Sequence, residues 1–257
     1  RPLFWRKCDG RIFFASEVKA LRAATGESFA IDRTALLQTL RFWTVIGDRT
    51  AFETVRQVPP GHYLSIIGAD MSLEKYWEYP IQDTLGSEKG ADHEEYIRAF
   101  REMMSKSVSR QLMADVEVGS YLSGGIDSSV IASVVSQQMH QGRFRTFSVA
   151  FDDPNYDESE AQTAVVSHLG VDHTTIQISK TDISRHFPEA VYHAETPLFR
   201  TAPVPLFLLS KAVQDSNMKV VLTGEGADEM LLGYDLFRET KIRRFWGRQP
   251  SEEYRGH

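Results

Sequence analysis

Between residues 116 and 223 the sequence alternates short apolar runs with longer amphipathic segments, and this alternation constrains the fold more than any other feature. Strands are predicted at 116–122, 145–151, 174–178 and 219–223, with helices of about 10–15 residues between them. Two parallel strands need a crossover of about a dozen residues or more, which a helix provides. We therefore expect an α/β fold, with a doubly wound, mostly parallel sheet covered by helices on both faces.

The first 80 residues show a different pattern of hairpins and short helices. Aromatic and β-branched residues flank Asp9-Gly10, a pair that suits a two-residue turn because both residues tolerate positive φ. Asp32 is the expected N-cap of a helix. The apolar side chains of this helix recur at helical spacing: Leu36, Leu37, Leu40 and Trp43.

The segment 81–91 contains Gly, Ser and Thr with scattered charges and no periodicity, so we expect a linker there. The predicted organisation is an incomplete α+β unit at 1–80, this linker, and an α/β domain at 92–257. Because the chain begins with Arg1 rather than Met, we expect it to be an interior piece of a longer protein.

The composition excludes several classes of protein. The formal net charge is −6, which argues against non-specific binding to nucleic acid. No apolar run approaches the roughly 18 residues of a membrane span, so no membrane partner is expected. A single cysteine excludes an internal disulfide framework and a thiolate zinc cluster, and the expected location is the reducing cytoplasm.

Ligands of parallel sheets bind where the strands end, and one strand is followed there by Ser123-Gly124-Gly125-Ile126-Asp127-Ser128-Ser129. The glycines allow a tight turn, the serines add hydroxyl groups, and the start of the next helix adds free N–H groups. These features predict a phosphate cradle. It is not a Walker A loop, because it lacks the Lys before Ser/Thr. An ordinary helix cap built of Ser, Gly and Asp is the alternative.

A second loop, Thr223-Gly224-Glu225-Gly226-Ala227-Asp228-Glu229, follows the last strand. It carries three carboxylates and no basic residue, a combination that is unfavourable without a cation. A solvated acidic loop is the alternative, but the position at a strand end, facing the first loop, favours a cation site. Asp127 would repel phosphate unless Mg²⁺ lay between them, so we expect Asp127 and Asp228 to share one Mg²⁺. Elsewhere, Asp157 and Glu160 are spaced as a capping box that begins a helix.

The two loops carry a resemblance to known enzymes. Ser123 to Ser129 resembles the pyrophosphate-binding loop of the ATP pyrophosphatases, the PP-loop family. Thr223 to Glu229, followed by Gly233-Tyr234, narrows the resemblance to the glutamine-hydrolysing asparagine synthetases. The early segment 14–21 is similar to a segment late in their glutaminase domain. The resemblance implies an ATP-pyrophosphatase domain, incomplete at its C-terminus. Before it would lie the C-terminal part of an N-terminal-nucleophile (amidotransferase type 2) glutaminase domain.

The resemblance also implies an activity. Such enzymes use MgATP to convert aspartate to β-aspartyl-AMP with release of pyrophosphate, and ammonia from glutamine then displaces AMP. The implied cofactors are ATP and Mg²⁺, the implied partners are these small molecules, and a homodimer is the usual assembly. Arg1 cannot replace the N-terminal Cys nucleophile, so this chain is not expected to use glutamine. Alternatives are a related amidotransferase or β-lactam-synthetase-like enzyme that adenylates a different carboxylate, and a nucleotide-binding protein without turnover.

Residue by residue, the resemblance assigns ATP binding to two sets of positions, with Leu122 and Val149 meeting the adenosine part through backbone groups. The ATP-binding positions are Leu122, Ser123, Gly124, Gly125, Asp127, Ser128, Val149, Thr223 and Gly224. It assigns metal binding to Asp127 and Asp228. It assigns catalytic roles to Glu225, in forming the acyl-adenylate, and to Tyr234.

Overall fold

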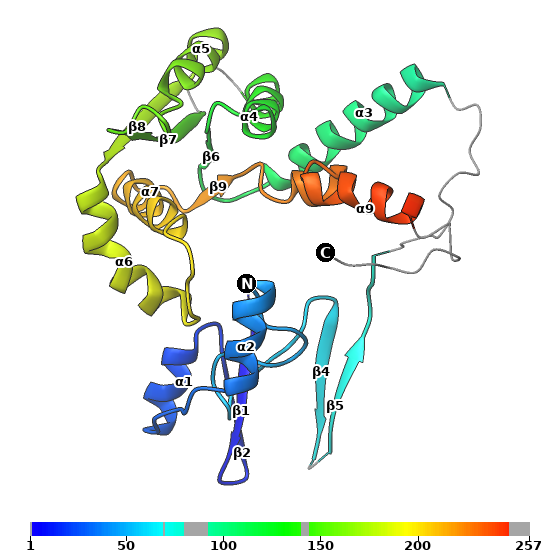
Figure 1. Ribbon diagram of the computed structural model, residues 1–257, viewed down its shortest axis with the longest axis vertical. Helices are drawn as coiled ribbons and strands as arrows, with labels where there is room; N and C mark the ends of the chain where they lie inside the picture. The colour runs from blue at the N-terminus through cyan, green and yellow to red at the C-terminus, as the bar shows by residue number, and fades with distance from the viewer. Residues whose placement is uncertain (1, 69, 80–91, 140–143, 247–257) are drawn as a thin grey trace. The chain divides into compact units, whose positions relative to one another are not determined.

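A computed structural model describes residues 2–68, 70–79, 92–139 and 144–246 (Figure 1). The chain divides into two compact units, Arg1–Ala91 with Lys180–Phe207 and Asp92–Ser179 with Leu208–His257. The expected linker at 81–91 lies outside the described residues. No helix in the described part of the chain is long and apolar enough to cross a membrane.

The first unit contains a three-stranded antiparallel sheet in the order β2-β1-β3. Its strands are β1 (Phe4–Cys8), β2 (Arg11–Ala15) and β3 (Arg56–Gln57). Cys8 pairs with Arg11, which leaves Asp9 and Gly10 as a two-residue turn with φ of 48° and 72°. These positive angles are those of a type I′ turn and confirm the predicted hairpin. A second hairpin joins β4 (His62–Ile67) and β5 (Asp70–Lys75).

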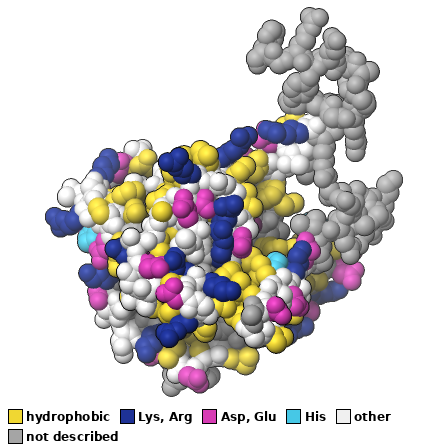
Figure 2. All heavy atoms as spheres, turned by 90° about the horizontal axis from the view of Figure 1, so that it is seen from below, with side chains coloured by type: hydrophobic (Ala, Val, Ile, Leu, Met, Phe, Trp, Pro, Cys, Tyr) yellow, Lys and Arg dark blue, Asp and Glu magenta, His cyan; other side chains and the backbone are white. Residues whose placement is uncertain are grey.

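Two helices accompany this sheet, α1 (Val18–Thr25) and α2 (Arg33–Phe42). Asp32 caps α2 as predicted, because its carboxylate accepts from the Thr34 and Ala35 N–H groups. Leu37 and Leu40 of α2 and Trp43 at its C-cap are 66%, 52% and 62% exposed. The helix instead buries the small side chains Ala35 and Thr39, which are four residues apart and share one face. Figure 2 shows one face of the molecule, seen from below the view of Figure 1, on which apolar side chains, in yellow, lie among charged ones.

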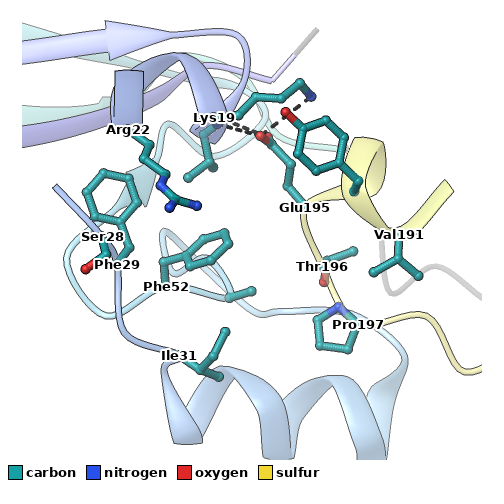
Figure 3. A pocket seen from close by; sticks show the side chains of 13 residues that line it. Lys19, Arg22, Ser28, Phe29, Ile31, Phe52, Val191, Glu195, Thr196 and Pro197 are labelled. Atoms are coloured by element: carbon teal, nitrogen blue, oxygen red, sulfur yellow. Dashed lines mark hydrogen bonds and ion pairs between the residues drawn. The ribbon is translucent and has the colours of Figure 1, made fainter. Parts of the chain in front are cut away.

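The segment Lys180–Phe207 belongs to the first unit, although it lies between two strands of the second unit in sequence. It contains α6 (Lys180–Ala194) and the start of α7 (Pro203–Asp215). The carboxylate of Glu195 accepts from the Val18 and Lys19 N–H groups, both at 2.6 Å (Figure 3). Glu17, at the N-cap of α1, makes no side-chain cap bond. Glu195 therefore caps α1 from a distant part of the chain.

A cavity of about 510 Å³ adjoins this cap, and mainly apolar side chains line it (Figure 3). One wall comes from α1 and the segments after it, including Phe29 and Phe52, and the other comes from the end of α6 and Pro197. Arg200, in the same segment as Pro197, stacks on the indole of Trp43 with 3.5 Å between its guanidinium carbon and the ring centroid.

The second unit contains a four-stranded sheet in the order β8-β7-β6-β9, and every pair is parallel. The strands are β6 (Val118–Tyr121), β7 (Arg145–Phe151), β8 (Asp172–Ile178) and β9 (Val220–Leu222). In sequence, α4 (Ile126–Gln138) separates β6 from β7, α5 (Ser159–Leu169) separates β7 from β8, and α6 and α7 precede β9. The predicted α/β alternation is confirmed.

Helices cover both faces of this sheet (Figure 1). On one face, α3 (His93–Gln111), α4 and α5 pack on Val118 of β6 and on Leu122, which follows this strand. On the other face, Leu209 and Val213 of α7 pack on Phe147 of β7. This arrangement confirms the doubly wound sheet. The chain order reverses at β6, since β7 lies on one side of β6 and β9 on the other.

The predicted capping box at the start of α5 is wrong. The helix begins at Ser159, and Glu158 precedes it without a side-chain cap bond. Asp157 instead accepts a hydrogen bond from the Ser159 hydroxyl at 2.6 Å and a longer one from the Phe151 N–H at 3.4 Å. Asp157 therefore joins the end of β7 to the first turn of α5. Beyond β9 the chain forms α8 (Ala227–Leu231) and α9 (Asp235–Trp246).

Candidate functional site

The two loops predicted to form the site meet at the point where the strand order reverses. The first follows β6 and the second follows β9, and these strands are neighbours. A Cβ atom placed on Gly224 would lie 2.9 Å from both the Asp127 Cβ and the Ser128 N. The backbone of the second loop is therefore in direct contact with the first, and only glycine fits at position 224. Crevices at such switch points are the usual ligand sites of parallel sheets.

Hydrogen bonds inside the first loop fix its shape. The Ser128 hydroxyl is buried and accepts from the Ser123 N–H at 3.1 Å. The hydroxyls of Ser123 and Ser128 are 2.9 Å apart, and the Ser123 hydroxyl also accepts from the Gly125 N–H. Gly124 has a φ of 86°, and a Cβ there would lie 3.0 Å from the Cβ of Ala161 in α5. The loop is therefore preformed and rests on the first turn of α5.

The helix after this loop is suited to bind an anion. Gly125 is the N-cap of α4 and offers no side-chain acceptor. The N–H groups of the first turn of this 13-residue helix therefore remain available to an external acceptor, and the helix dipole favours negative charge at the same place. Asp127 also lies in this first turn.

The strand edge beside the loop carries the backbone groups of Leu122 and Val149. The Leu122 N–H donates to the Phe147 carbonyl at 2.9 Å. Because backbone groups two residues apart in a strand face the same side, those of Val149 face the side on which β6 has already ended. The Val149 carbonyl accepts from the side-chain amide of Gln162 at 3.0 Å. The resemblance predicted that backbone groups of Val149 meet adenosine, and the carbonyl among them already accepts a hydrogen bond within the chain.

The second loop gathers acidic side chains around Tyr234. The Tyr234 hydroxyl donates to the Glu229 carboxylate at 3.0 Å. This hydrogen bond, with the negative charges of Glu229, Asp228 and Glu225 in addition, raises the pKa of Tyr234 above its ordinary value. Tyr234 therefore keeps its hydroxyl hydrogen at neutral pH and acts as a hydrogen-bond donor. Glu225 is exposed, Thr223 is half-buried, and the Asp228 carboxylate fills the space where a side chain on Gly233 would lie.

The carboxylates of Asp127 and Asp228 fit a magnesium site in their chemistry. Mg²⁺ is usually bound by one or two carboxylates together with substrate phosphates and water. Both side chains are half-buried, and within the described residues neither carboxylate has a hydrogen bond or an ion pair. A cluster of three or more His, Cys, Asp or Glu suited to a metal does not occur among the described residues. A site of this kind would therefore need phosphate oxygens to complete it.

Comparison with known proteins gives two family matches. Residues 99–256 match the family described as asparagine synthase, and residues 1–77 match the glutamine amidotransferase domain. The two regions follow each other in the order that the resemblance implied.

Two curated relatives show similarity along most of the chain. The sequence of this chain is 34% identical to that of "Amidase chyE" of Penicillium rubens over 254 residues, which is 93% of this chain and 37% of that protein. It is 31% identical to "Asparagine synthetase [glutamine-hydrolyzing] 1" of Bacillus subtilis over 255 residues, which is 98% of this chain and 38% of that protein. The chain thus spans less than two fifths of the length of these relatives.

A solved NH3-dependent NAD synthetase from Campylobacter jejuni aligns with 53% of this chain and 60% of its own, with 19% identity and a TM-score of 0.39. A likeness of this size adds nothing to the interpretation of the site.

Proposed function

Because the chain belongs to the asparagine synthase family, we propose that its second unit binds MgATP and transfers AMP to a carboxylate substrate. The observation that carries this proposal is the contact of Gly224 with Asp127 and Ser128. It joins an anion cradle to an acidic loop at the switch point of a parallel sheet. A helix cap or a solvated acidic loop would explain either loop alone, but neither explains why the two loops touch.

The chemistry explains why both loops are needed. A carboxylate is a poor electrophile, and adenylation gives it a leaving group. Attack on the α-phosphate drives negative charge onto the departing pyrophosphate. The N–H groups at the start of α4 and the hydroxyl of Ser123 are the donors that would stabilise this charge, and a bound Mg²⁺ would supply further charge stabilisation.

We assign the residues as follows. Asp127 and Asp228 hold Mg²⁺, Glu225 assists formation of the acyl-adenylate, and Tyr234 donates a hydrogen bond in the site. ATP contacts come from both loops and from the β7 edge: Leu122, Ser123, Gly124, Gly125, Asp127, Ser128, Val149, Thr223 and Gly224. The burial of Ser128 and its bonds to Ser123 favour a role in shaping the loop beside any ligand contact.

The proposed acceptor is aspartate, which yields β-aspartyl-AMP and then asparagine when ammonia displaces AMP. Support comes from relatives named asparagine synthetase at about 30% identity. Residues 1–80 are proposed as the end of a glutaminase domain, 81–91 as a linker and 92–257 as the synthetase domain. A cytoplasmic homodimer is the proposed form of the protein.

A different carboxylate is the second candidate. The relative named amidase chyE is 34% identical to this chain, and the named asparagine synthetase is 31% identical. Similarity of this kind does not separate one acceptor acid from another. Which acid is used depends on the residues that bind the acid rather than on the fold.

The test is acid-dependent exchange of labelled pyrophosphate into ATP, together with calorimetric binding of MgATP to the chain. Asp127→Asn and Asp228→Asn are expected to reduce exchange about a hundredfold or more. Asp235→Asn is the matched control, because the exposed carboxylate of Asp235 pairs with the exposed side chain of Arg238 on α9. Normal exchange in both loop variants would refute the metal assignment.

The same assay with a panel of acids separates the candidates. Exchange with L-aspartate supports asparagine synthesis, whereas exchange with another acid and none with L-aspartate supports the second candidate. Tight binding of MgATP with no exchange for any acid would indicate a nucleotide-binding protein without turnover.

A further inference from the structure

Gln162 is a buried polar side chain beside the site, and the proposed function leaves it unused. It lies in the first turn of α5, and only 4% of its surface is exposed. Burying an amide costs free energy unless its hydrogen bonds are made. A buried glutamine in an otherwise apolar helix face therefore needs partners of its own.

The partners of this amide are two carbonyl groups on different elements. Its nitrogen donates to the Val149 carbonyl in β7 at 3.0 Å and lies 3.5 Å from the carbonyl of Ser123. Both neighbours are acceptors, so the nitrogen of the amide must face them. One side chain thus connects the edge of β7 to the first residue of the loop after β6.

The backbone around Gln162 supports the same loop. A Cβ atom on Gly124 would lie 3.1 Å from the Gln162 N, so the loop turns directly over the first turn of α5. That turn is joined to the end of β7 through Asp157, which accepts from Ser159 and Phe151. The first turn of α5 is therefore fixed to β7 on one side and to the loop on the other.

We propose that Gln162 is a positioning residue of the nucleotide site, a role that rests on the proposed function. Its amide fixes the separation between the Val149 carbonyl and the Ser123–Ser129 loop, so that the N–H groups of the loop are ordered before the polyphosphate arrives. Ordering the loop in advance removes an entropic cost from binding. Gln162 also fixes the direction of the Val149 carbonyl, because its amide donates one hydrogen bond to that oxygen.

The first test is Gln162→Met, which keeps the length of the side chain and removes both donors. We expect amide hydrogen exchange at Gly124 and Gly125 to become about tenfold faster and MgATP to bind about tenfold more weakly. Gln138→Met is the matched control. Gln138 lies at the end of α4 far from the loop, and its amide donates to the Ser105 carbonyl of α3. The control is expected to change neither measurement.

The second test is Gln162→Glu, measured over a range of pH. An ionised carboxylate faces two carbonyl oxygens and has no donor, whereas the protonated acid can donate one O–H to Val149. MgATP binding by this variant, divided by that of the wild type at the same pH, is therefore expected to rise as the pH falls. Burial alone also penalises the ionised carboxylate, so this dependence supports the positioning role only together with faster exchange in Gln162→Met. The variant also replaces Gln162→Met if that protein does not fold.

Unchanged exchange at Gly124 and Gly125 in Gln162→Met, or a pH-independent ratio for Gln162→Glu, would overturn the positioning role. If the wild type does not bind MgATP, the proposed function fails. The exchange measurement still decides whether Gln162 orders the loop, because it needs no ligand.

Discussion

Replacing Glu195 with Ala tests whether a single carboxylate fixes the segment Lys180–Phe207 within the first unit. The Glu195 carboxylate is only 9% exposed and accepts from the Val18 and Lys19 N–H groups at 2.6 Å. Loss of an N-cap costs about 0.5–2 kcal/mol, and hydrogen bonds to a charged group contribute about 1.5–3 kcal/mol each. Water that enters after truncation offsets part of this loss. We expect the free energy of unfolding to fall by about 2–3 kcal/mol.

Backbone strain at position 195 affects the wild type and Glu195→Ala equally. Glu195 has a φ of 53°, which disfavours Glu and Ala alike. The difference between wild type and Glu195→Ala therefore reports the side chain. A glycine at this position would relieve the strain and conceal part of the effect, so it is the wrong substitution.

The assay is urea unfolding followed by tryptophan fluorescence. Trp43 is well placed as the reporter, since Arg200 of the same segment stacks on its ring. Glu189→Ala is the matched control, because Glu189 lies on α6, the helix that precedes Glu195, and its exposed carboxylate pairs with His186 of the same helix. The control is expected to shift stability by less than about 0.5 kcal/mol. A loss below that limit in Glu195→Ala would refute the reasoning.

A second substitution separates capping from attachment. Glu17 has φ of −140° and ψ of 141°, the extended conformation of an N-cap, but makes no cap bond. Glu17→Ser added to Glu195→Ala is expected to recover about 1 kcal/mol by capping α1 locally. It should leave hydrogen exchange at the end of α6 as fast as in the single variant. Recovery of slow exchange there would mean that Glu195 acts on α1 alone.

Three further predictions concern single groups. The N–H of Ala35 and further hydrogen bonds lower the pKa of Asp32. Asp32 therefore contributes to the free energy of unfolding above about pH 4, and this contribution is lost as the pH falls further. Asp32→Ala should cost about 1 kcal/mol at pH 7 by urea unfolding, and less in acid. Burial lowers the pKa of His173, so the folded state favours the neutral ring. The free energy of unfolding of the wild type should therefore fall as the pH drops below about 6.5, and that of His173→Gln should fall less. Gly224→Ala places a Cβ 2.9 Å from that of Asp127 and should weaken MgATP binding at least about tenfold by calorimetry, with far-UV circular dichroism unchanged.

The sequence predicted the central strands β6 and β7 well because most of their residues are buried. Strands buried on both faces carry few charged residues, and β7 has the predicted limits, 145–151. The buried face of α2 did not follow from its apolar pattern. Leu37 and Leu40 recur at helical spacing, but the residues that the helix buries, Ala35 and Thr39, are too small or too polar to dominate an apolar pattern.

The two loops were predictable because glycines and carboxylates at a strand end are a local signal. Gln162 and Glu195 were not predictable as functional positions. Gln162 acts on Ser123 and Val149, which are 39 and 13 residues away, and Glu195 acts on Val18, which is 177 residues away. The one available signal for Gln162 is a polar residue within an apolar stretch of α5, and that signal does not identify its partners.

The glycines show how the structure adds to a local pattern. Gly26 and Gly170 end helices, and a Cβ on either would meet nothing within 4 Å, so positive φ alone accounts for them. Gly224 has ordinary φ, but Asp127 and Ser128 of the facing loop fill the space of its side chain. The sequence does not distinguish these two kinds of glycine. A glycine that is required by the close approach of a distant loop marks the place where two loops are held together, and here that place is the site proposed for the nucleotide.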